Sequence, residues 1–377
     1  MEQIYYTQCP VGYGLGASNG FQVKRITPGY PVAGDFRHLG LRAFPGGGRA
    51  LAPPALRYRR VGETAEVAYL TPRAMEYETE RGLWGRPGGH FAHGLILARE
   101  ELRGVDNWPA GLYRAACWRR TDPEPSRGRA PDPVAISPED LLTTPDFASV
   151  ATLAEGLDTG LLARLLAGLF AAAREGRTLF LIDEPDRLGP RVALLTFLVP
   201  RPLRAAVTFS TFHDRPEELP GYRIHGTTPA SRPNRALLLT QGIVADLTTG
   251  AVEPRVEPPA WSVVVAGWVA NGEAAAWGDF GRRLAAAGKS AGFAPWDDGW
   301  LDRLVSFGQA VANDEAPGNW GEEIDLASWA ARSNLSSEWA SVRGPGWWRR
   351  AEVDDGGRPA LLALAGLPDS WKLHPPE

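Results

Sequence analysis

Short alternations of apolar and polar residues occupy the first third of the chain. β-Branched and aromatic residues recur there in runs that Gly and Pro clusters separate, which is the pattern of strands. The runs lie at residues 2–8, 20–26, 65–72, 90–97 and 111–118. Helical periodicity is weak in this part. We therefore expect residues 1–120 to form a strand-rich α+β recognition domain.

The pattern becomes helical after a segment rich in Pro and Arg. Residues 121–136 show no hydrophobic period, which is typical of a linker. Ser137, followed by acidic residues at 139 and 140, indicates the start of a short helix. Leucines at helical spacing then predict a longer helix over residues 159–176.

A buried strand is expected next, at the apolar run 178–182. A helix over 185–199 and a second strand over 204–212 follow it. This order indicates at least one β-α-β unit with parallel strands. We expect a mixed α/β middle domain over residues 137–258.

Tryptophan is concentrated in the last part of the chain. Eleven of the 14 tryptophans lie from Trp261 to Trp371, within Ala-, Asp- and Gly-rich stretches of helical character. Their spacing has no fixed period, so a solenoid of repeats is not indicated. Residues 259–377 are expected to form a Trp-rich, mainly helical C-terminal region.

The composition makes several classes of function less expected, although it excludes few. The net charge of -4 and the pI near 6.0 give no general attraction to nucleic acid or anionic membranes. Cys9 and Cys117 are too few for a disulfide framework and too far apart for a metal knuckle. The N-terminus has no export pattern, and Arg164 and Arg174 interrupt and end the most apolar stretch. We expect a cytoplasmic protein with no membrane partner.

The glycines near the start resemble a phosphate-binding loop. Gly12, Gly14 and Gly16 precede Gly20, but a dinucleotide fingerprint requires a helix after it, and an alternating strand pattern follows here. We interpret the glycines as a shaped turn between two strands.

Asp183 and Glu184 end an apolar strand, as the Walker B carboxylates of P-loop ATPases do. No phosphate loop precedes them, and the GKS sequence at 288–290 lies downstream with Arg283 in place of the required first glycine. A structural role is therefore favoured, with Asp186 capping the next helix. No cofactor is expected.

His90 and His93 have a spacing that suggests a metal site only on a helix. On the expected strand they point to opposite faces, so no metal is expected. The favoured roles are one buried, hydrogen-bonded histidine and one that lines a groove beside Arg86.

One short segment provides the residue types of a nucleophile and its base, with Ser210, Thr211, His213 and Asp214. No G-x-S-x-G elbow is present, and catalytic triads are assembled from distant parts of a chain. We interpret the segment as a strand end followed by a turn.

Two segments, residues 57–63 and 346–353, mix arginines with aromatic residues, as single-strand nucleic-acid binders do. Because acidic residues surround them, solvated strand faces and cation-π packing are favoured. Consecutive side chains diverge, so Trp347 and Trp348 cannot both be buried easily. They are candidates for a protein-binding surface.

Three separated segments carry a family resemblance. Residues 5–23, 85–97 and 200–229 resemble the N-terminal and middle domains of the bacterial GTPase-associated protein family, in family order. The resemblance covers about residues 1–250 and implies a non-enzymatic component of GTPase-centred conflict, antiviral defence or signalling systems. A small GTPase from the same gene cluster and other proteins of the system are the implied partners. No catalytic residue is implied.

We therefore expect an adaptor or regulator that acts by protein–protein interaction. A nucleotide-dependent enzyme that uses Asp183 and Glu184 remains an alternative, and a nucleic-acid sensor is a second. The candidate binding residues are Gly12, Gly14, Gly16, Arg86, His90, His93, Trp347 and Trp348.

Overall fold

The protein forms two compact units, Met1–Glu257 and Pro258–Glu377, which are described separately. The computed structural model describes residues 1–31, 36–48, 50–75, 78–79, 82–83, 87–121, 146–288, 296–312, 320–333, 335 and 337–339. Nearly all of the expected linker and the helix expected at Ser137 lie outside these residues. The expected domain boundaries stay predictions.

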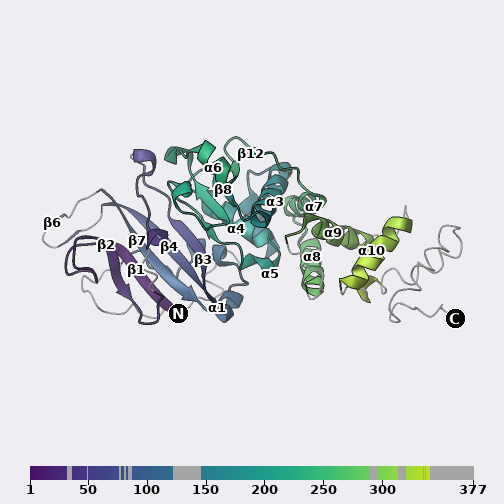
Figure 1. Ribbon diagram of the computed structural model, residues 1–377, viewed down its shortest axis with the longest axis horizontal. Coiled ribbons are helices and arrows are strands. Elements are labelled where there is room, and N and C mark those ends of the chain that lie inside the picture. The colour runs from purple at the N-terminus through teal and green to yellow at the C-terminus, as the bar shows by residue number, and fades with distance from the viewer. Residues whose placement is uncertain are drawn as a thin grey trace. The chain divides into compact units, whose positions relative to one another are not determined.

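One ten-stranded sheet runs through the first unit (Figure 1). Its strand order is β12-β11-β8-β10-β9-β3-β4-β7-β1-β2. The strands are β1 (Glu2–Cys9), β2 (Gly20–Ile26), β3 (Ala55–Val61), β4 (Thr64–Met75), β7 (Pro87–Leu97), β8 (Thr178–Ile182), β9 (Phe209–Ser210), β10 (Ile224–Thr227), β11 (Gly242–Asp246) and β12 (Ala251–Glu253). The short strands β5 (Glu78–Thr79) and β6 (Gly82–Leu83) form a separate pair.

The N-terminal half of this sheet is antiparallel and confirms four of the five expected strands, as β1, β2, β4 and β7. The fifth expectation, residues 111–118, is wrong. Those residues enter a 3-10 helix, Pro109–Arg114, whose Pro at the first position favours a helical turn. Trp108 before it is fully buried, and its Nε1 donates to the carbonyl oxygen of Ala193 at 3.0 Å.

The other half is parallel over β11, β8, β10 and β9. Its helices are α2 (Phe147–Ala151), α3 (Thr159–Arg174), α4 (Leu188–Leu198), α5 (Arg201–Arg204) and α6 (Arg235–Gln241). The expected β-α-β unit is confirmed as β8, α4 and β9, with β10 inserted between the two strands. The expected cap at Asp186 is wrong, because α4 begins after Arg187 with no side-chain cap.

A short antiparallel pairing between β3 and β9 joins the two halves. It consists of the pairs Arg57–Ser210 and Tyr58–Phe209. Arg57 is buried, and its Nε and Nη1 donate to Ser210 Oγ at 3.2 Å and to the carbonyl oxygen of His38 at 2.5 Å. Burial lowers the pKa of Arg57 to about 10. The solvated strand face expected over residues 57–63 is therefore wrong at Arg57 and Tyr58.

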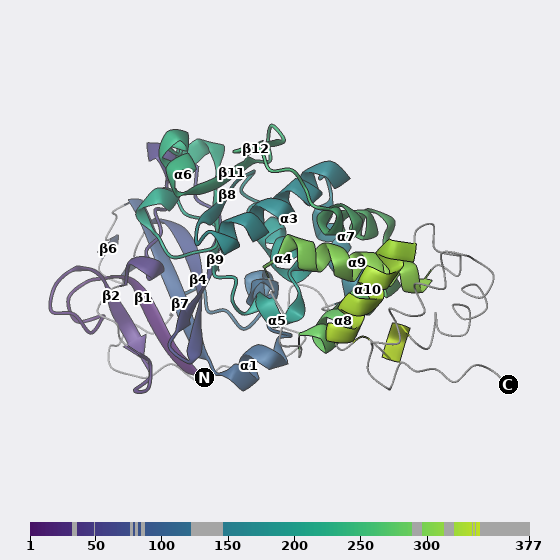
Figure 2. The same ribbon diagram turned by 45° about the vertical axis from the view of Figure 1, so that its right-hand side comes forward.

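The second unit contains helices and confirms the expected helical, Trp-rich C-terminal region. Figure 2 shows α7 (Ala260–Asn271), α8 (Ala274–Ala287), α9 (Asp298–Ala312) and α10 (Trp320–Arg332). Trp261 is buried, and its Nε1 donates to Asp298 Oδ1 at 3.0 Å. Trp329 contacts the rings of Trp300 and Phe307. The described tryptophans thus supply much of this core.

The described residues include no single helix that is both long and apolar enough to cross a membrane. The consecutive segments Phe147–Ala154 and Thr159–Arg174 reach that length only together, and they meet at a bend of 103°.

Gly226 provides a test of how tightly the parallel half is packed. A Cβ atom there would lie 2.1 Å from the carbonyl oxygen of Thr211, whereas Gly104, at the end of α1 (Arg99–Gly104), has nothing within 4 Å of that position. We expect Gly226→Ala to cost about 1–3 kcal/mol because backbone must move. Gly104→Ala should leave stability unchanged or slightly higher. Thermal melting followed by circular dichroism measures both, and equal melting temperatures would contradict this packing.

Candidate functional site

The glycine-rich segment connects β1 to β2 as a shaped turn, which confirms the structural interpretation from the sequence. Gly12 and Gly20 have φ angles of +91° and +137°, a region that favours glycine. A Cβ on Gly14 or Gly16 would lie 2.6 or 2.5 Å from the side-chain amide of Gln22. The backbone N–H of Gly16 donates to that amide oxygen. The turn is therefore folded closely onto β2.

Three aromatic rings beside this turn form the wall of what we call the aromatic groove. Tyr6 of β1 lies between Phe21 of β2 and Phe36, with ring centroids 6.1 and 5.4 Å away and planes inclined by 18° and 26°. Two adjoining cavities of about 420 and 470 Å³ share these rings. The first also reaches Leu15 and Gly16 of the turn.

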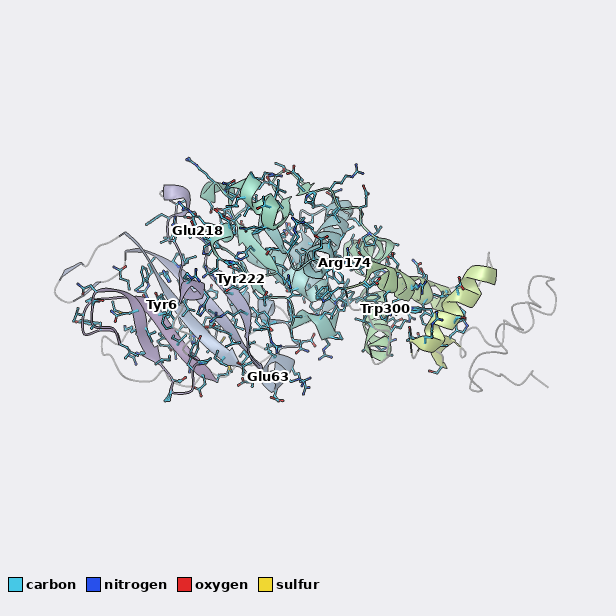
Figure 3. The ribbon with its side chains drawn as sticks, viewed as in Figure 1. Tyr6, Glu63, Arg174, Glu218, Tyr222 and Trp300 are labelled. Carbon is cyan, nitrogen blue, oxygen red and sulfur yellow. The ribbon has the colours of Figure 1, made fainter. Side chains whose placement is uncertain are left out.

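The larger cavity of the groove draws on both halves of the sheet. Tyr6 and Glu218, both labelled in Figure 3, line it together with Arg42, His90 and His213. Tyr6 comes from β1, whereas Glu218 ends the 3-10 helix Pro216–Glu218, which lies between β9 and β10. The larger cavity therefore forms only when the two halves are joined, whereas the smaller one is lined by residues 6–36 alone.

His90 and His93 lie on opposite faces of β7, as the sequence predicts. His90 stacks on Phe21 with centroids 4.6 Å apart, and its Nε2 donates to the carbonyl oxygen of Leu39 at 2.7 Å. His93 packs edge-on to Tyr5 and Trp118, and its Nδ1 accepts from the backbone N–H of residue 119. His90 thus lines the groove and His93 does not.

A third cavity, of about 540 Å³, adjoins the groove and shares Arg42 with it. Arg42, Arg215 and Arg232 line it, and we call it the arginine pocket. It lies after the carboxyl ends of β9 and β10, where open α/β sheets commonly bind ligands. Asp214 is buried there, accepting from the backbone N–H of Gly46 at 2.9 Å and pairing with Arg42 at 3.5 Å.

Sequence reasoning missed most of these lining residues. Phe21 carries one signal, an aromatic residue on a strand directly after a glycine turn. Phe36 and Arg42 lie near each other in the chain and Arg232 lies far from both, all three in loops, and no spacing rule connects them. Arg86, Trp347 and Trp348 lie outside the described residues, so their binding roles stay predictions.

Asp183 contacts Arg191, which in turn binds the backbone of the segment before α3. Asp183 is buried after β8, where Oδ1 accepts from the backbone N–H of Glu184 at 2.8 Å and Oδ2 lies 3.5 Å from Arg191 Nε. Both terminal nitrogens of Arg191 donate, at 2.6 Å, to the carbonyl oxygens of Leu153 and Glu155. Asp183 thereby positions the segment before α3. The Glu184 side chain is exposed.

The hydroxyl and imidazole groups near β9 have separate local partners. Ser210 Oγ donates to the carbonyl oxygen of Phe212 at 3.0 Å and accepts from Arg57. Thr211 Oγ1 accepts from the backbone N–H of Leu56, and His213 Nδ1 accepts from that of Arg215. These bonds connect β9 to its surroundings.

Burial keeps four histidines of the first unit uncharged. It lowers the pKa of His90 to about 4, of His93 and His225 to about 3, and of His213 to about 2. Histidine in an unfolded chain has a pKa near 6.5. As pH falls below about 6.5, the unfolded chain therefore binds protons that the folded chain does not.

We expect stability to fall below pH 6.5, with each such histidine contributing up to about 1.4 kcal/mol per pH unit. Urea denaturation at pH 7.5, 6.5 and 5.5 measures the slope. His225→Gln should be less stable at pH 7.5 but lose less stability on acidification. A wild-type stability that stays constant from pH 7.5 to 5.5 would contradict the burial of uncharged rings.

Comparison with known proteins identifies one segment of this unit. Residues 148–249 match the family model described as GTPase-associated protein 1, middle domain. A curated protein of Mycolicibacterium smegmatis (strain MKD8), named putative ESX-1 scaffolding and assembly protein SaeB, is 31% identical over 184 residues. The match covers 46% of this chain and 20% of that protein. No solved structure matches.

The matched segment runs from α2 to β11 and its following turn, and so contains the parallel half of the sheet. It also contains Asp214, Arg215 and Arg232 of the arginine pocket. The family resemblance expected from the sequence is confirmed over this segment, and the chain carries a middle domain of the GTPase-associated protein family.

Proposed function

We propose that the protein is a non-enzymatic adaptor or scaffold that acts by protein–protein contact, with a small GTPase as its partner. The observation that carries this proposal is the match of residues 148–249 to the middle domain of GTPase-associated protein 1. The name of the M. smegmatis relative, a putative scaffolding and assembly protein, gives further support. The aromatic groove supplies a surface suited to a protein partner.

The contacts of the two candidate catalytic groups support a non-catalytic role. The Asp183 carboxylate contacts Arg191 and a backbone N–H, which leaves it poorly placed to hold a metal–nucleotide. The Ser210 hydroxyl donates to a backbone carbonyl, whereas a nucleophile requires a base as its hydrogen-bond partner. Both groups stabilise the fold through these contacts.

The wider setting of this role is part of the same proposal. The resemblance of the chain to the GTPase-associated protein family supports a place in GTPase-centred conflict, antiviral defence or signalling systems of bacteria, in the cytoplasm. The other proteins of such a system would be further partners. A scaffold of this kind would bring them to the GTPase without changing the nucleotide itself.

Direct binding tests the GTPase proposal. The full chain would be immobilised, and a small GTPase encoded beside its gene would be passed over it in GDP-bound and GTP-analogue-bound forms. We expect saturable binding in at least one form, with an affinity of about 1 μM or tighter, which is about -8 kcal/mol. A small GTPase from an unrelated gene neighbourhood is the control and should not bind. Failure of both nucleotide forms to bind would contradict the proposed partner.

Nucleotide binding by the chain itself should be absent. Calorimetry with ATP and GTP in Mg²⁺ should give no heat of binding, because no phosphate loop accompanies Asp183. Asp183→Asn should lower the melting temperature through its contact with Arg191 and should change nothing in calorimetry. Micromolar binding that this substitution abolishes would support a nucleotide-dependent enzyme instead.

A further inference from the structure

We propose that the aromatic groove and the arginine pocket together bind one extended segment of a partner protein, with aromatic or large apolar side chains in the groove and acidic side chains in the pocket. The inference rests on the proposed function only for the partner's identity. The binding chemistry follows from the residues that line the three cavities.

The three cavities lie next to one another. The cavities of about 420 and 470 Å³ share Tyr6, Phe21 and Phe36, and the cavities of about 470 and 540 Å³ share Arg42. Together they extend from the β1–β2 turn, past His213 after β9, to the residues that follow β10. A segment that contacts all three must reach from the aromatic rings to the arginines, which suits an extended chain.

The groove end exposes apolar surface that solvent does not favour. Leu15 and Phe21, which line the smaller cavity, are 48% and 41% exposed, and Val11 in the same turn is 57% exposed. Apolar residues grouped at a cavity are characteristic of binding surfaces rather than of ordinary exterior. The stacked rings of Tyr6, Phe21 and Phe36 suit another aromatic side chain, which gains from ring contact as well as from burial.

The pocket end suits carboxylates. Arg42, Arg215 and Arg232 reach the pocket from three segments, and a guanidinium group offers five N–H donors in a planar arrangement that matches a carboxylate. Arg215 already donates from Nη1 to Glu218 Oε1 at 2.8 Å. Arg42 and the exposed Arg232 are therefore the arginines that offer donors to a ligand. The Arg42 side chain is 55% exposed, and its contact with Asp214 is 3.5 Å, longer than a normal hydrogen bond. Donors of Arg42 thus remain for a ligand. In the adjoining larger cavity of the groove, His213 adds a neutral ring.

Acidic residues at the same end favour a peptide over a nucleic acid. Asp214 and Glu217 line the arginine pocket, and Glu218 lines the adjoining cavity. These carboxylates would repel a regularly charged phosphate backbone, whose binding depends on an excess of cations. A peptide carries its charges at separate positions, so its acidic side chains can contact the arginines and avoid the carboxylates.

Selection from a library of random twelve-residue peptides, displayed on phage and exposed to the full chain, tests the chemistry. We expect the selected sequences to place an aromatic or large apolar residue a few positions from Asp or Glu. The most enriched peptide would then be synthesised with a fluorescent label, and its affinity measured by anisotropy.

Matched variants locate the binding site. Phe21→Ser, Leu15→Ser and Arg42→Gln should each weaken the peptide about tenfold, as loss of an anchor does. The controls are Leu237→Ser on α6, whose side chain is 41% exposed, and Arg255→Gln, whose side chain is 85% exposed and paired with Glu257. Both controls should bind within about twofold of wild type. Circular dichroism would verify that each variant is folded, and Leu15, in the turn, offers a second test if Phe21→Ser is unstable.

Three results would overturn the proposal: no shared pattern among selected peptides, unchanged affinity in the folded groove variants, or a single-stranded oligonucleotide that binds more tightly than the peptide. The GTPase experiment separates this outcome from failure of the proposed function. A GTPase that binds wild type and all groove variants equally leaves the adaptor role intact and removes the groove from it. Peptide binding at the groove without GTPase binding would support the groove as a peptide site and contradict the GTPase as the partner.

Discussion

The pairing of β3 with β9 is the contact on which the first unit depends. It joins an antiparallel half-sheet to a parallel one through a short ladder that contains the residue pairs Arg57–Ser210 and Tyr58–Phe209. A strand of two residues has little stability of its own. Side-chain bonds reinforce the pairing: Tyr58 Oη donates to the carbonyl oxygen of Ala205 at 2.7 Å, and Leu56 N–H donates to Thr211 Oγ1 at 2.8 Å.

Arg57 is the residue of this junction whose burial is unfavourable in free energy. Burial of a guanidinium requires compensation, which Ser210 Oγ and the carbonyl oxygen of His38 provide in part. Nη2 of Arg57 is buried and has no hydrogen-bond partner among the described residues. The charge of Arg57 also contributes, after burial itself, to the low pKa values of His213 and His225. The junction therefore helps, after burial, to keep these two histidines uncharged.

Much of the local structure could be predicted from the sequence, because it depends on local patterns. The alternation of β1, β2, β4 and β7 and the leucine period of α3 identify their elements, and a strand places His90 and His93 on opposite faces. The helical turn at Pro109–Arg114 could not be predicted from its own residues. Its apolar side chains are buried by the packing around Trp108 and not by a strand pairing. A groove lined by one of the two histidines could be predicted, and His90 lines it. The larger cavity as a whole could not, because His213 reaches Tyr6 and Phe36 only through the junction of the two half-sheets.

The junction also has a consequence for the growing chain. Ser210 follows Arg57 by 153 residues, so a ribosome must add most of the middle segment before β9 exists. Domains commonly fold from the N-terminus during synthesis, and the antiparallel half-sheet would then have β3 as an open edge. Open edges promote aggregation, and charged side chains on them oppose it. Arg60, which is exposed in the part of β3 that β9 never covers, is placed to give that protection while the chain is still incomplete.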